Sequence, residues 1–367
     1  MYRCVDCGDT YPVQAATSYR CDCGGAFRFA DPPLPAGPPE IRPPNRDAGL
    51  WAFDFLPVDR TVTLGEGWTP LVAAPDRDVS YKLEALFPTA SFKDRGAAVT
   101  LSQAATFGVD RVVEDSSGNA GAAIATYAAR AGIDAEIFVP ADAKPGKLTA
   151  IERSDATVRR IDGSRQDVTD ACIAAIEADS ENTEQGADAW YASHAWQPSF
   201  LEGTATFAYE VAAQRDWSVP DAVVTPLGHG TLFLGAYLGF HRLHRAGWTD
   251  GVPRLYGAQA AGTAPIVAER HGESVAAGAN ELADGIQIRN PARRGEILDA
   301  LAATGGDVVA VDRETTETEH RRLGRRGFHV EPTCAVAPAA LDILREQGAI
   351  GPDEDVVVPL TGSGLAT

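Results

Sequence analysis

This sequence contains few lysines and no long apolar segment. Lysine occurs only at positions 82, 93, 144 and 147, and 51 Asp and Glu against 32 Lys and Arg give a formal net charge of −19. Proteins that bind the nucleic-acid backbone use basic faces to displace counterions, so this charge argues against a nucleic-acid partner. No stretch approaches the roughly 20 apolar residues of a membrane helix, and residues 1–4 do not open an apolar signal-peptide core. We therefore expect a cytoplasmic protein with no membrane partner.

The excess of acidic residues has two explanations. A surface rich in Asp and Glu and poor in Lys is typical of halophilic proteins, because hydrated charge keeps a chain soluble in high salt. An ordinary acidic enzyme from a GC-rich genome is the alternative. The hydrophobic share of 44% fits a soluble globular protein, and 367 residues suggest about two domains. Because lysine is so rare, each lysine is a candidate for a specific role.

Four of the six cysteines form two close pairs near the N-terminus, and a glycine follows each pair. Two such turns can bring four thiolates together around a tetrahedral zinc ion, and a site filled by sulfur is structural. Disulfides are the alternative, but they suit a cytoplasmic protein poorly. Zinc ribbons often bind nucleic acid, but the arginines of this region are scattered. We predict a zinc ribbon over residues 1–30, with structural Zn²⁺ on Cys4, Cys7, Cys21 and Cys23.

The rest of the chain follows a proline-rich segment. Residues 31–45 are too rich in proline for a helix or a central strand, and we expect a linker over residues 31–60. Apolar β-branched runs then alternate with Ala-rich stretches, which predicts an α/β fold with helices on both faces of parallel sheets. The expected strands are 111–114, 135–140, 157–161, 222–225, 307–311 and 355–359, and the expected helices are 120–131, 167–178 and 233–243. Ligands of such folds bind where strands end.

One lysine stands at a predicted helix start. Pro88 ends the preceding segment, and Ser91 can cap a helix that begins near Phe92. Lys93 then lies in the first helical turn, at the positive end of the helix dipole. Nearby positive charge lowers the pKa of an amine and makes it a better Schiff-base nucleophile. The alternative is a surface lysine with no chemical role.

Two glycine-containing turns follow predicted strands. Residues 116–121 (SSGNAG) would expose backbone N–H groups at a helix start, where a carboxylate can bind. Residues 228–231 (GHGT) would let the backbone approach a phosphate, although the Gly-Lys-Ser/Thr of a nucleotide P-loop is absent. Each turn alone is equally compatible with an ordinary capped turn, and His229 is then a simple loop residue. Cys172 is expected to pack in a core. Cys334 follows Glu331-Pro332-Thr333, in a loop that could face a ligand, and has no assigned role, with core packing favoured.

Five motifs in order resemble the fold-type II pyridoxal-phosphate-dependent enzymes (the tryptophan synthase beta-like superfamily), and among them the threonine synthase branch, in which an N-terminal zinc ribbon is common. The motifs are PTASFKDRG at 88–96, SSGNAG at 116–121, GHGTL at 228–232, VEPTCAVA at 330–337 and LTGSGL at 360–365. The resemblance implies two three-layer parallel-sheet domains. These are a larger cofactor-binding domain, 61–94 and 207–367, and a smaller mobile substrate domain, 95–206. A homodimer is expected as the commonest soluble oligomer.

The resemblance also implies a role for each motif residue. Lys93 would bind pyridoxal 5'-phosphate as a Schiff base and then act as acid and base. Thr361 would face the pyridine nitrogen and leave it unprotonated, which suits elimination and replacement chemistry. The cofactor's 3′ oxygen and phosphate would be bound by Asn119 and by Gly228, His229, Gly230 and Thr231, and the carboxylate of a small amino-acid substrate by Ser116, Ser117 and Gly118.

Two departures from the branch leave the substrate open. Threonine synthases usually carry an Asn-Ser and then an Arg before a Glu-Gly, whereas the corresponding run 193–203 has Phe200 at the place of the arginine. A dianionic phosphate needs charge-assisted donors. Ala366 replaces the usual C-terminal lysine. Conversion of O-phosphohomoserine to threonine is the first candidate, followed by a threonine or serine ammonia-lyase giving a 2-keto acid and by β-replacement as in cysteine or cysteate synthesis. A binding protein with a retired catalytic domain is disfavoured by Lys93, Asn119 and Thr361.

Overall fold

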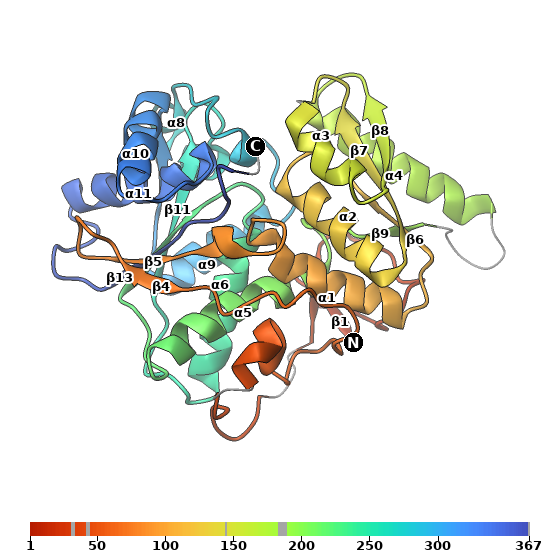
Figure 1. Cartoon of the computed structure of the whole chain (residues 1–367), viewed down its shortest axis with the longest axis horizontal. Coiled ribbons are helices and arrows are strands. Elements are labelled where there is room, and N and C mark those ends of the chain that lie inside the picture. Colours follow the sequence, from red (N-terminus) through yellow and green to blue (C-terminus); the bar gives the residue numbers. More distant parts are fainter. Residues whose placement is uncertain (31–33, 42–44, 144, 183–188, 366–367) are drawn as a thin grey trace. The chain divides into compact units, whose positions relative to one another are not determined.

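A computed structural model describes the chain except for residues 31–33, 42–44, 144, 183–188 and 366–367 (Figure 1). Parts of the predicted linker, Lys144 and Ala366 therefore lie outside the described residues. The chain divides into two compact units. Unit 1 comprises Met1–Pro33, Asp47–Gly67 and Lys93–Gly203, and unit 2 comprises Leu34–Arg46, Trp68–Phe92 and Thr204–Thr367. Each unit is described by itself.

Unit 1 contains a parallel four-stranded sheet with the order β8-β7-β6-β9. The strands are β6 (Arg111–Glu114), β7 (Asp134–Pro140), β8 (Thr157–Ile161) and β9 (Trp190–Tyr191). The helices are α1 (Lys93–Thr106), α2 (Asn119–Ala131), α3 (Pro145–Glu152) and α4 (Arg165–Asn182), while α5 (Pro198–Gln214) begins in unit 1 and ends in unit 2. This is the α/β arrangement that the alternating pattern predicts.

Successive strand residues in unit 1 point to two different apolar cores, as the period of a strand requires. Val112 belongs to a large core that also includes buried alanines of α1 and α2. Its neighbour Val113 belongs to a second core with Val168 and Cys172 of α4. Helices therefore cover both faces of the sheet, and Cys172 is a fully buried core residue as expected.

The N-terminal segment forms a small antiparallel sheet of its own. Its strands β1 (Tyr2–Cys4), β2 (Thr10–Tyr11) and β3 (Phe27–Phe29) have the order β2-β1-β3. Tyr2 stacks on Phe27 at 5.8 Å between ring centroids and lies edge-on to Phe29 at 5.1 Å. These rings belong to the large core of unit 1, so apolar packing attaches this small sheet to α1.

Unit 2 contains a six-stranded sheet with the order β12-β11-β10-β13-β5-β4, in which only the β4–β5 pair is antiparallel. Its strands are β4 (Leu71–Ala73), β5 (Ser80–Lys82), β10 (Ala222–Pro226), β11 (Arg254–Ala260), β12 (Val308–Val311) and β13 (Val356–Pro359). Its α-helices are α6 (Thr231–Arg245), α7 (Pro265–His271), α8 (Glu273–Ala276), α9 (Arg294–Thr304), α10 (Arg313–Arg325) and α11 (Pro332–Glu346). Short 3-10 helices are η1 (Asn45–Ala52), which spans the boundary of the units, η2 (Glu84–Leu86) and η3 (Asp284–Ile286).

Helix α11 packs against the central strands of unit 2 and closes its core. Val224, Ala258 and Val358 form one apolar cluster with buried residues of α11. Figure 1 shows α10 and α11 on one side of this sheet and α6 and α9 on the other. The parallel-sheet part of the predicted fold class is thus confirmed.

The sequence predicted the longer elements and missed several others. The six predicted strands correspond to β6, β7, β8, β10, β12 and β13, and the predicted helices to α2, α4 and α6. Strand β11 was not predicted because Gly257 and Gln259 interrupt its apolar run. Strand β9 has only two residues. Within the predicted linker, Leu50 and Phe53 are fully buried.

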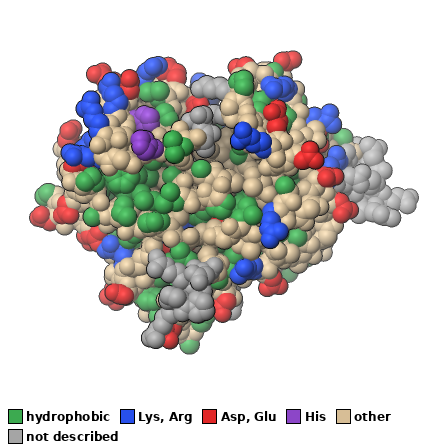
Figure 2. All heavy atoms as spheres, in the orientation of Figure 1, with side chains coloured by type: hydrophobic (Ala, Val, Ile, Leu, Met, Phe, Trp, Pro, Cys, Tyr) green, Lys and Arg blue, Asp and Glu red, His purple; other side chains and the backbone are tan. Residues whose placement is uncertain are grey.

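Charged side chains of both signs lie on the surface of the chain. Figure 2 shows Asp and Glu side chains beside Lys and Arg side chains over the face that it draws, and the described residues form no continuous basic area on that face. Among the described residues no helix combines the length and apolar character needed to cross a membrane.

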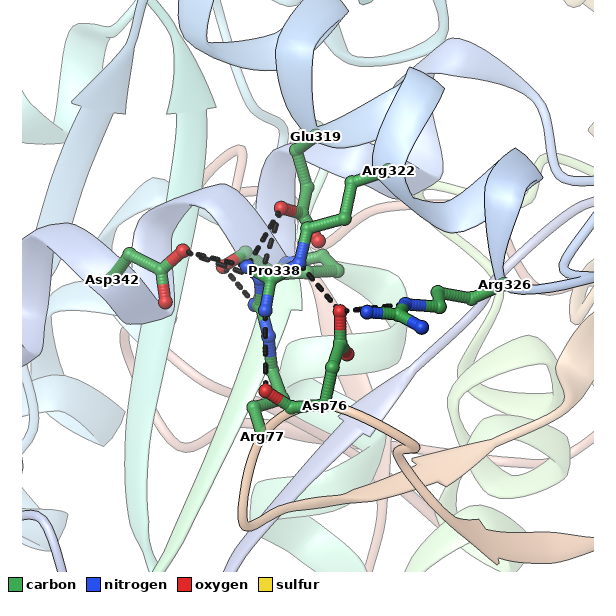
Figure 3. Close-up of polar contacts among 7 residues, drawn as sticks. All are labelled: Asp76, Arg77, Glu319, Arg322, Arg326, Pro338 and Asp342. Carbon is green, nitrogen blue, oxygen red and sulfur yellow. Dashed lines mark hydrogen bonds and ion pairs between the residues drawn. The ribbon is translucent and has the colours of Figure 1, made fainter.

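A network of ion pairs joins the β4–β5 loop to α10 and α11 (Figure 3). The Arg77 guanidinium donates to Glu319 at 2.9 Å, to Asp342 at 3.2 Å and to the Pro338 carbonyl at 2.9 Å. Asp76 accepts from Arg322 at 2.9 Å, and also from Arg326 at 3.1 Å. The Arg77 side chain is only 4% exposed. The planar guanidinium fork of Arg77 serves here as a donor to acceptors on two helices.

Lys82, one of the four lysines, has a structural role as part of a buried ion pair. Its side chain and that of Glu210 are both 0% exposed and form an ion pair of 2.7 Å. The ammonium also donates to the Thr69 carbonyl at 2.7 Å and to the Gln214 side chain at 3.0 Å. Three acceptors thus match its three N–H donors. Lys82 has a structural role at the end of β5.

We predict that Lys82→Met lowers the free energy of unfolding by about 3–5 kcal/mol, because it leaves the Glu210 carboxylate buried and unpaired. Urea denaturation in high salt measures the change. Arg321→Ala is the matched control. It removes a pair with Glu317 of 3.7 Å whose side chains are 59% and 48% exposed, so we expect a change within about 0.5 kcal/mol. Equal effects of the two substitutions would contradict the structural role of Lys82.

Candidate active site

Lys93 is the first residue of helix α1, as the sequence predicted. The preceding residue, Phe92, donates its N–H to the Thr361 carbonyl at 3.0 Å, and Ser91 forms a β-bridge with Gly362. The segment that leads into Lys93 is therefore tied to the segment after β13. The Lys93 side chain is half-buried, and its Nζ lies 5.7 Å from the centroid of the Phe200 ring.

Phe200 depends on a glycine of α1 for its position. It is 0% exposed, and a Cβ added at Gly96 would lie 2.3 Å from its ring atoms. A Cβ at Gly203, on α5, would lie 2.0 Å from the Arg95 carbonyl oxygen. The start of α5 can approach α1 this closely only because both positions are glycine. An apolar ring thus stands beside the Lys93 amine, where the sequence comparison expected an arginine.

Two residues that the sequence did not single out form a buried pair next to this ring. Glu114 ends β6 and is 0% exposed, and His194 is 4% exposed. The carboxyl oxygens contact the His194 ring nitrogen Nδ1 at 2.6 Å and accept the His194 backbone N–H at 3.0 Å. The imidazole lies edge-on to Phe200 at 6.0 Å between ring centroids.

Burial sets the protonation of this pair. It raises the pKa of Glu114 to about 7, although the His194 N–H and the charges of Lys93 and Arg165 act in the opposite direction. Burial also lowers the pKa of His194, and the Lys93 charge adds to that effect. Burial thus disfavours the charged form of each member of the pair, at the position where β6 leads into the predicted anion-binding turn.

Asp115 anchors the same turn from the other face of the sheet. It accepts the Tyr191 hydroxyl at 2.9 Å and the Thr169 hydroxyl at 2.5 Å. Tyr191 belongs to β9 and Thr169 to α4. The two acidic residues at the end of β6 thus fix the turn to its neighbouring strand and helix.

The turn 116–121 has the predicted geometry of a helix start. Helix α2 begins at Asn119, with Gly118 as its N-cap. Gly121 is required because a Cβ there would lie 1.8 Å from the Ser116 carbonyl oxygen. Ser116 is buried, and Ser117 and Gly118 are half-buried. Backbone N–H groups at a helix N-terminus attract anions such as a carboxylate.

The second predicted turn lies in unit 2. It follows β10 and leads into α6, which begins at Thr231. Gly230 has the left-handed conformation with φ of 80°, and a Cβ there would lie 2.7 Å from Ile297. Gly228 and Gly230 are buried and His229 is half-buried. A glycine backbone at the start of a 15-residue helix suits a phosphate group.

Thr361 lies at the same edge of the unit 2 sheet. It follows β13, which pairs in parallel with β10, so Thr361 and the turn 228–231 both come after the carboxyl ends of neighbouring strands. The Thr361 hydroxyl contacts the Cys334 sulfur at 3.1 Å, and the Gly362 N–H donates to this sulfur at 2.9 Å. Burial raises the pKa of the Cys334 thiol, which keeps it neutral. Cys334 is a core residue as expected, and it also orients Thr361.

The four N-terminal cysteines converge in unit 1. Their sulfur atoms all lie within 4.8 Å of one another. Cys4 and Cys23 are separated by 3.5 Å between sulfurs, and Cys7 and Cys21 by 3.6 Å. A disulfide bond is about 2.0 Å long. Four thiolates around zinc at about 2.3 Å would have edges of roughly 3.8 Å. The described distances are close to that tetrahedral spacing.

Comparison with known proteins identifies the family. A family model described as "Pyridoxal-phosphate dependent enzyme" matches residues 62–362. The chain belongs to this family of pyridoxal-phosphate-dependent enzymes. The predicted family and the prediction of an enzyme with pyridoxal phosphate are therefore confirmed.

Sequence similarity to threonine synthases extends over nearly the whole chain. Threonine synthase of Methanocaldococcus jannaschii is 32% identical over 386 residues, covering 100% of this chain and 92% of the relative. Threonine synthase of Methanosarcina acetivorans is 31% identical and covers 98% and 90%. Among solved structures, maize serine racemase matches with a TM-score of 0.68 at 20% identity, covering 86% and 91%, and a threonine deaminase from T.th. with 0.64 at 23%, covering 80% and 92%. These structures show the fold alone.

The site residues of this pyridoxal-phosphate family member fall into two sets. Unit 1 holds Lys93 and the turn 116–119, and unit 2 holds the turn 228–231 and Thr361. Sequence reasoning missed Glu114, His194 and Asp115. The sequence did contain a signal for them. Two acidic residues, Glu114 and Asp115, directly precede a turn predicted to bind a carboxylate, and such neighbours would repel it unless they had partners of their own. Their partners, however, lie 54 to 80 residues away in the chain.

We predict that Gly96→Ala lowers the free energy of unfolding by about 1–3 kcal/mol, because the new methyl group overlaps the Phe200 ring. Denaturation of Gly96→Ala, Phe200→Leu and the double variant measures the coupling, which should exceed about 0.5 kcal/mol for residues in contact. Gly295→Ala is the control, because nothing lies within 4 Å of its added Cβ. Strict additivity of the two site substitutions would disprove the steric contact.

Proposed function

We propose that this protein is a threonine synthase that converts O-phosphohomoserine to threonine with pyridoxal phosphate. The observation that carries the proposal is the similarity to threonine synthases at 31–32% identity over 98–100% of the chain. The presence of Lys93 at a helix start, held by the segment that contains Thr361, supports it. Bound pyridoxal phosphate supplies an electron sink for negative charge at the substrate α-carbon.

The chemistry of the residues in each unit supports a role for this cofactor. The Lys93 amine would carry the cofactor and then accept and return the proton at the α-carbon of the substrate. The Thr361 hydroxyl, next to a neutral thiol, would face the pyridine nitrogen. The remaining roles are a 3′-oxygen contact from Asn119, phosphate contacts from Gly228, His229, Gly230 and Thr231, and substrate-carboxylate contacts from Ser116, Ser117 and Gly118.

The same proposal includes two domains. These are a larger cofactor-binding domain, 61–94 and 207–367, and a smaller mobile substrate domain, 95–206. It also includes a homodimer, a cytoplasmic location and activity in high salt. The acidic composition supports the last of these. It also argues against nucleic acid as a partner.

One observation favours a second function. Phe200 is fully buried beside the Lys93 amine, where a phosphate-binding arginine was expected. An apolar ring cannot stabilise a phosphate dianion, and it suits a substrate with an uncharged hydroxyl. A threonine or serine ammonia-lyase that forms a 2-keto acid is therefore the second candidate.

We predict that the holoenzyme in high salt releases phosphate and threonine in equal amounts from O-phosphohomoserine. Phosphate release and amino-acid analysis measure this, beside keto-acid formation from threonine and serine. Lys93→Ala should abolish the visible absorbance of the bound cofactor and lower kcat/KM by about a thousandfold or more, because it removes the acid-base group. Keto acid from threonine or serine, without phosphate release, would establish the ammonia-lyase instead. If neither phosphate nor keto acid is formed, β-replacement remains as the third candidate function.

We also propose that Cys4, Cys7, Cys21 and Cys23 bind one structural Zn²⁺. The spacing of the four sulfurs supports this. With four sulfur ligands the ion has no open position for chemistry. Its role would be to stabilise the small sheet whose Tyr2 and Phe27 rings pack in the core with α1.

We predict one zinc per chain in the purified protein and its loss in Cys4→Ser/Cys7→Ser, because the remaining two thiolates cannot complete a tetrahedral site. Elemental analysis by mass spectrometry measures the metal. Cys172→Ala is the control, since Cys172 is buried in a different core, and it should keep the zinc. Full zinc content in the double variant, or a disulfide in the wild type, would reject the ribbon site.

A further inference from the structure

The pair of Glu114 and His194 is the part of unit 1 that the proposed function does not use. Both carboxyl oxygens of Glu114 are directed at one residue, with contacts of 2.6 Å to the ring nitrogen Nδ1 and 3.0 Å to the backbone N–H. The side chain of Glu114 is 0% exposed, and that of His194 is 5% exposed. A carboxyl group buried this completely is costly unless it has a specific partner.

The charged groups around this pair are few. Lys93 of α1 and Arg165 of α4 act on both members of the pair, and Asp115 acts on His194. Tyr191 of β9 and Cys172 of α4 lie in the core with Val113, on the opposite face of the sheet. Burial raises the pKa of each of these last two groups, so both stay neutral. Arginine keeps its charge at all relevant pH values. The raised pKa of Glu114 makes this pair the candidate for proton exchange near neutral pH.

The pair can exist in two charge states. With Glu114 ionised, Nδ1 of His194 donates to the carboxylate and the pair carries one negative charge. After one proton is added, the pair is neutral, whether the proton lies on the carboxyl group or on the imidazole. In both neutral forms the second ring nitrogen, Nε2, carries a hydrogen. The raised pKa of Glu114, about 7, places this step near neutral pH.

Phe200 connects this step to Lys93. The Lys93 Nζ lies 5.7 Å from the Phe200 ring centroid, and the His194 ring lies 6.0 Å from the same centroid. The ring is fully buried, and charges beside a buried apolar ring interact more strongly than they would in solvent. A negative charge on the pair stabilises the Lys93 ammonium, and its loss favours the neutral amine.

We propose that Glu114 and His194 are positioning residues that, by gaining or losing one shared proton, set the charge of the Lys93 amine. The proposal rests on the role proposed for Lys93, but it concerns a proton equilibrium and not turnover. It assigns a function to the acidic residue at the end of β6. It also explains why an apolar ring, and not a cation, stands beside Lys93.

The test is the rate at which Lys93 reacts with acetic anhydride as a function of pH, measured on the full chain freed of its cofactor with hydroxylamine. Because the sequence has only four lysines, mass spectrometry of peptides resolves Lys93. Glu114→Gln keeps the shape and the hydrogen-bonding capacity of the side chain and removes its charge. We expect the midpoint of the rate profile to fall, so that Lys93 reacts about three- to tenfold faster at pH 7.5.

The shape of the profile separates this role from a structural one. A charge effect moves the midpoint and leaves the plateau at high pH unchanged. A merely loosened site raises the rate at every pH, and that result would overturn the proposal. Glu136→Gln is the matched control. Its carboxylate is 8% exposed on the neighbouring strand, and it pairs with Arg159, so its profile should match the wild type.

A second measurement needs no change at position 114. The chain has seven histidines, and ¹⁵N NMR of labelled histidine, with His194→Gln for assignment, reports the state of each ring nitrogen. We expect Nε2 of His194 to gain its proton as the pH falls through about 7, in wild-type protein. Nitrogen signals of His194 that stay constant between pH 6 and pH 8 would overturn the proposal. Neither measurement depends on which substrate the enzyme uses.

Discussion

The absence of a side chain at Gly96 is the constraint on which the rest of the unit 1 site depends. The Phe200 ring occupies the space that a Cβ at this position would fill, and Gly203 allows α5 to begin against the Arg95 carbonyl. Because Phe200 is fixed in this way, its ring faces both the Lys93 amine and the His194 imidazole. The surroundings of the reactive lysine thus follow from helix packing and not from a flexible loop.

Two buried cations of this acidic chain are paired with acidic side chains. The buried Lys82 serves Glu210, and the almost buried Arg77 serves the acidic groups of α10 and α11. Each of these cations has enough acceptors to balance its burial. The surroundings of Lys93 include an apolar ring, because its Nζ lies 5.7 Å from the centroid of the Phe200 ring. The role proposed for Lys93 therefore places a reactive lysine and the structural Lys82 in different surroundings within the same chain.

The sequence predicted those parts of the site that rest on local rules. Lys93 at a helix start, the turn 116–121 and the turn 228–231 each depend on a few adjacent residues, and glycine and serine reveal them. The Glu114–His194 pair depends on a parallel contact between β6 and β9, two strands separated by some 75 residues. Strand β9 has two residues and β11 contains a glycine, so neither gives a clear apolar pattern. Long-range pairing of short strands is the information that sequence patterns lack.

The leaving group of the substrate is the question on which these features converge. Similarity over the whole chain supports a phosphorylated substrate, while Phe200 removes an expected cation from beside Lys93. A phosphate dianion and an ionised Glu114 would repel each other, because both are anions in a region shielded from water. An uncharged hydroxyl group tolerates either state of the pair. A phosphorylated substrate that binds beside Phe200 would therefore favour the protonated pair, whereas a hydroxy amino acid would not, and the same buried carboxyl group would distinguish the two candidate functions by their dependence on pH.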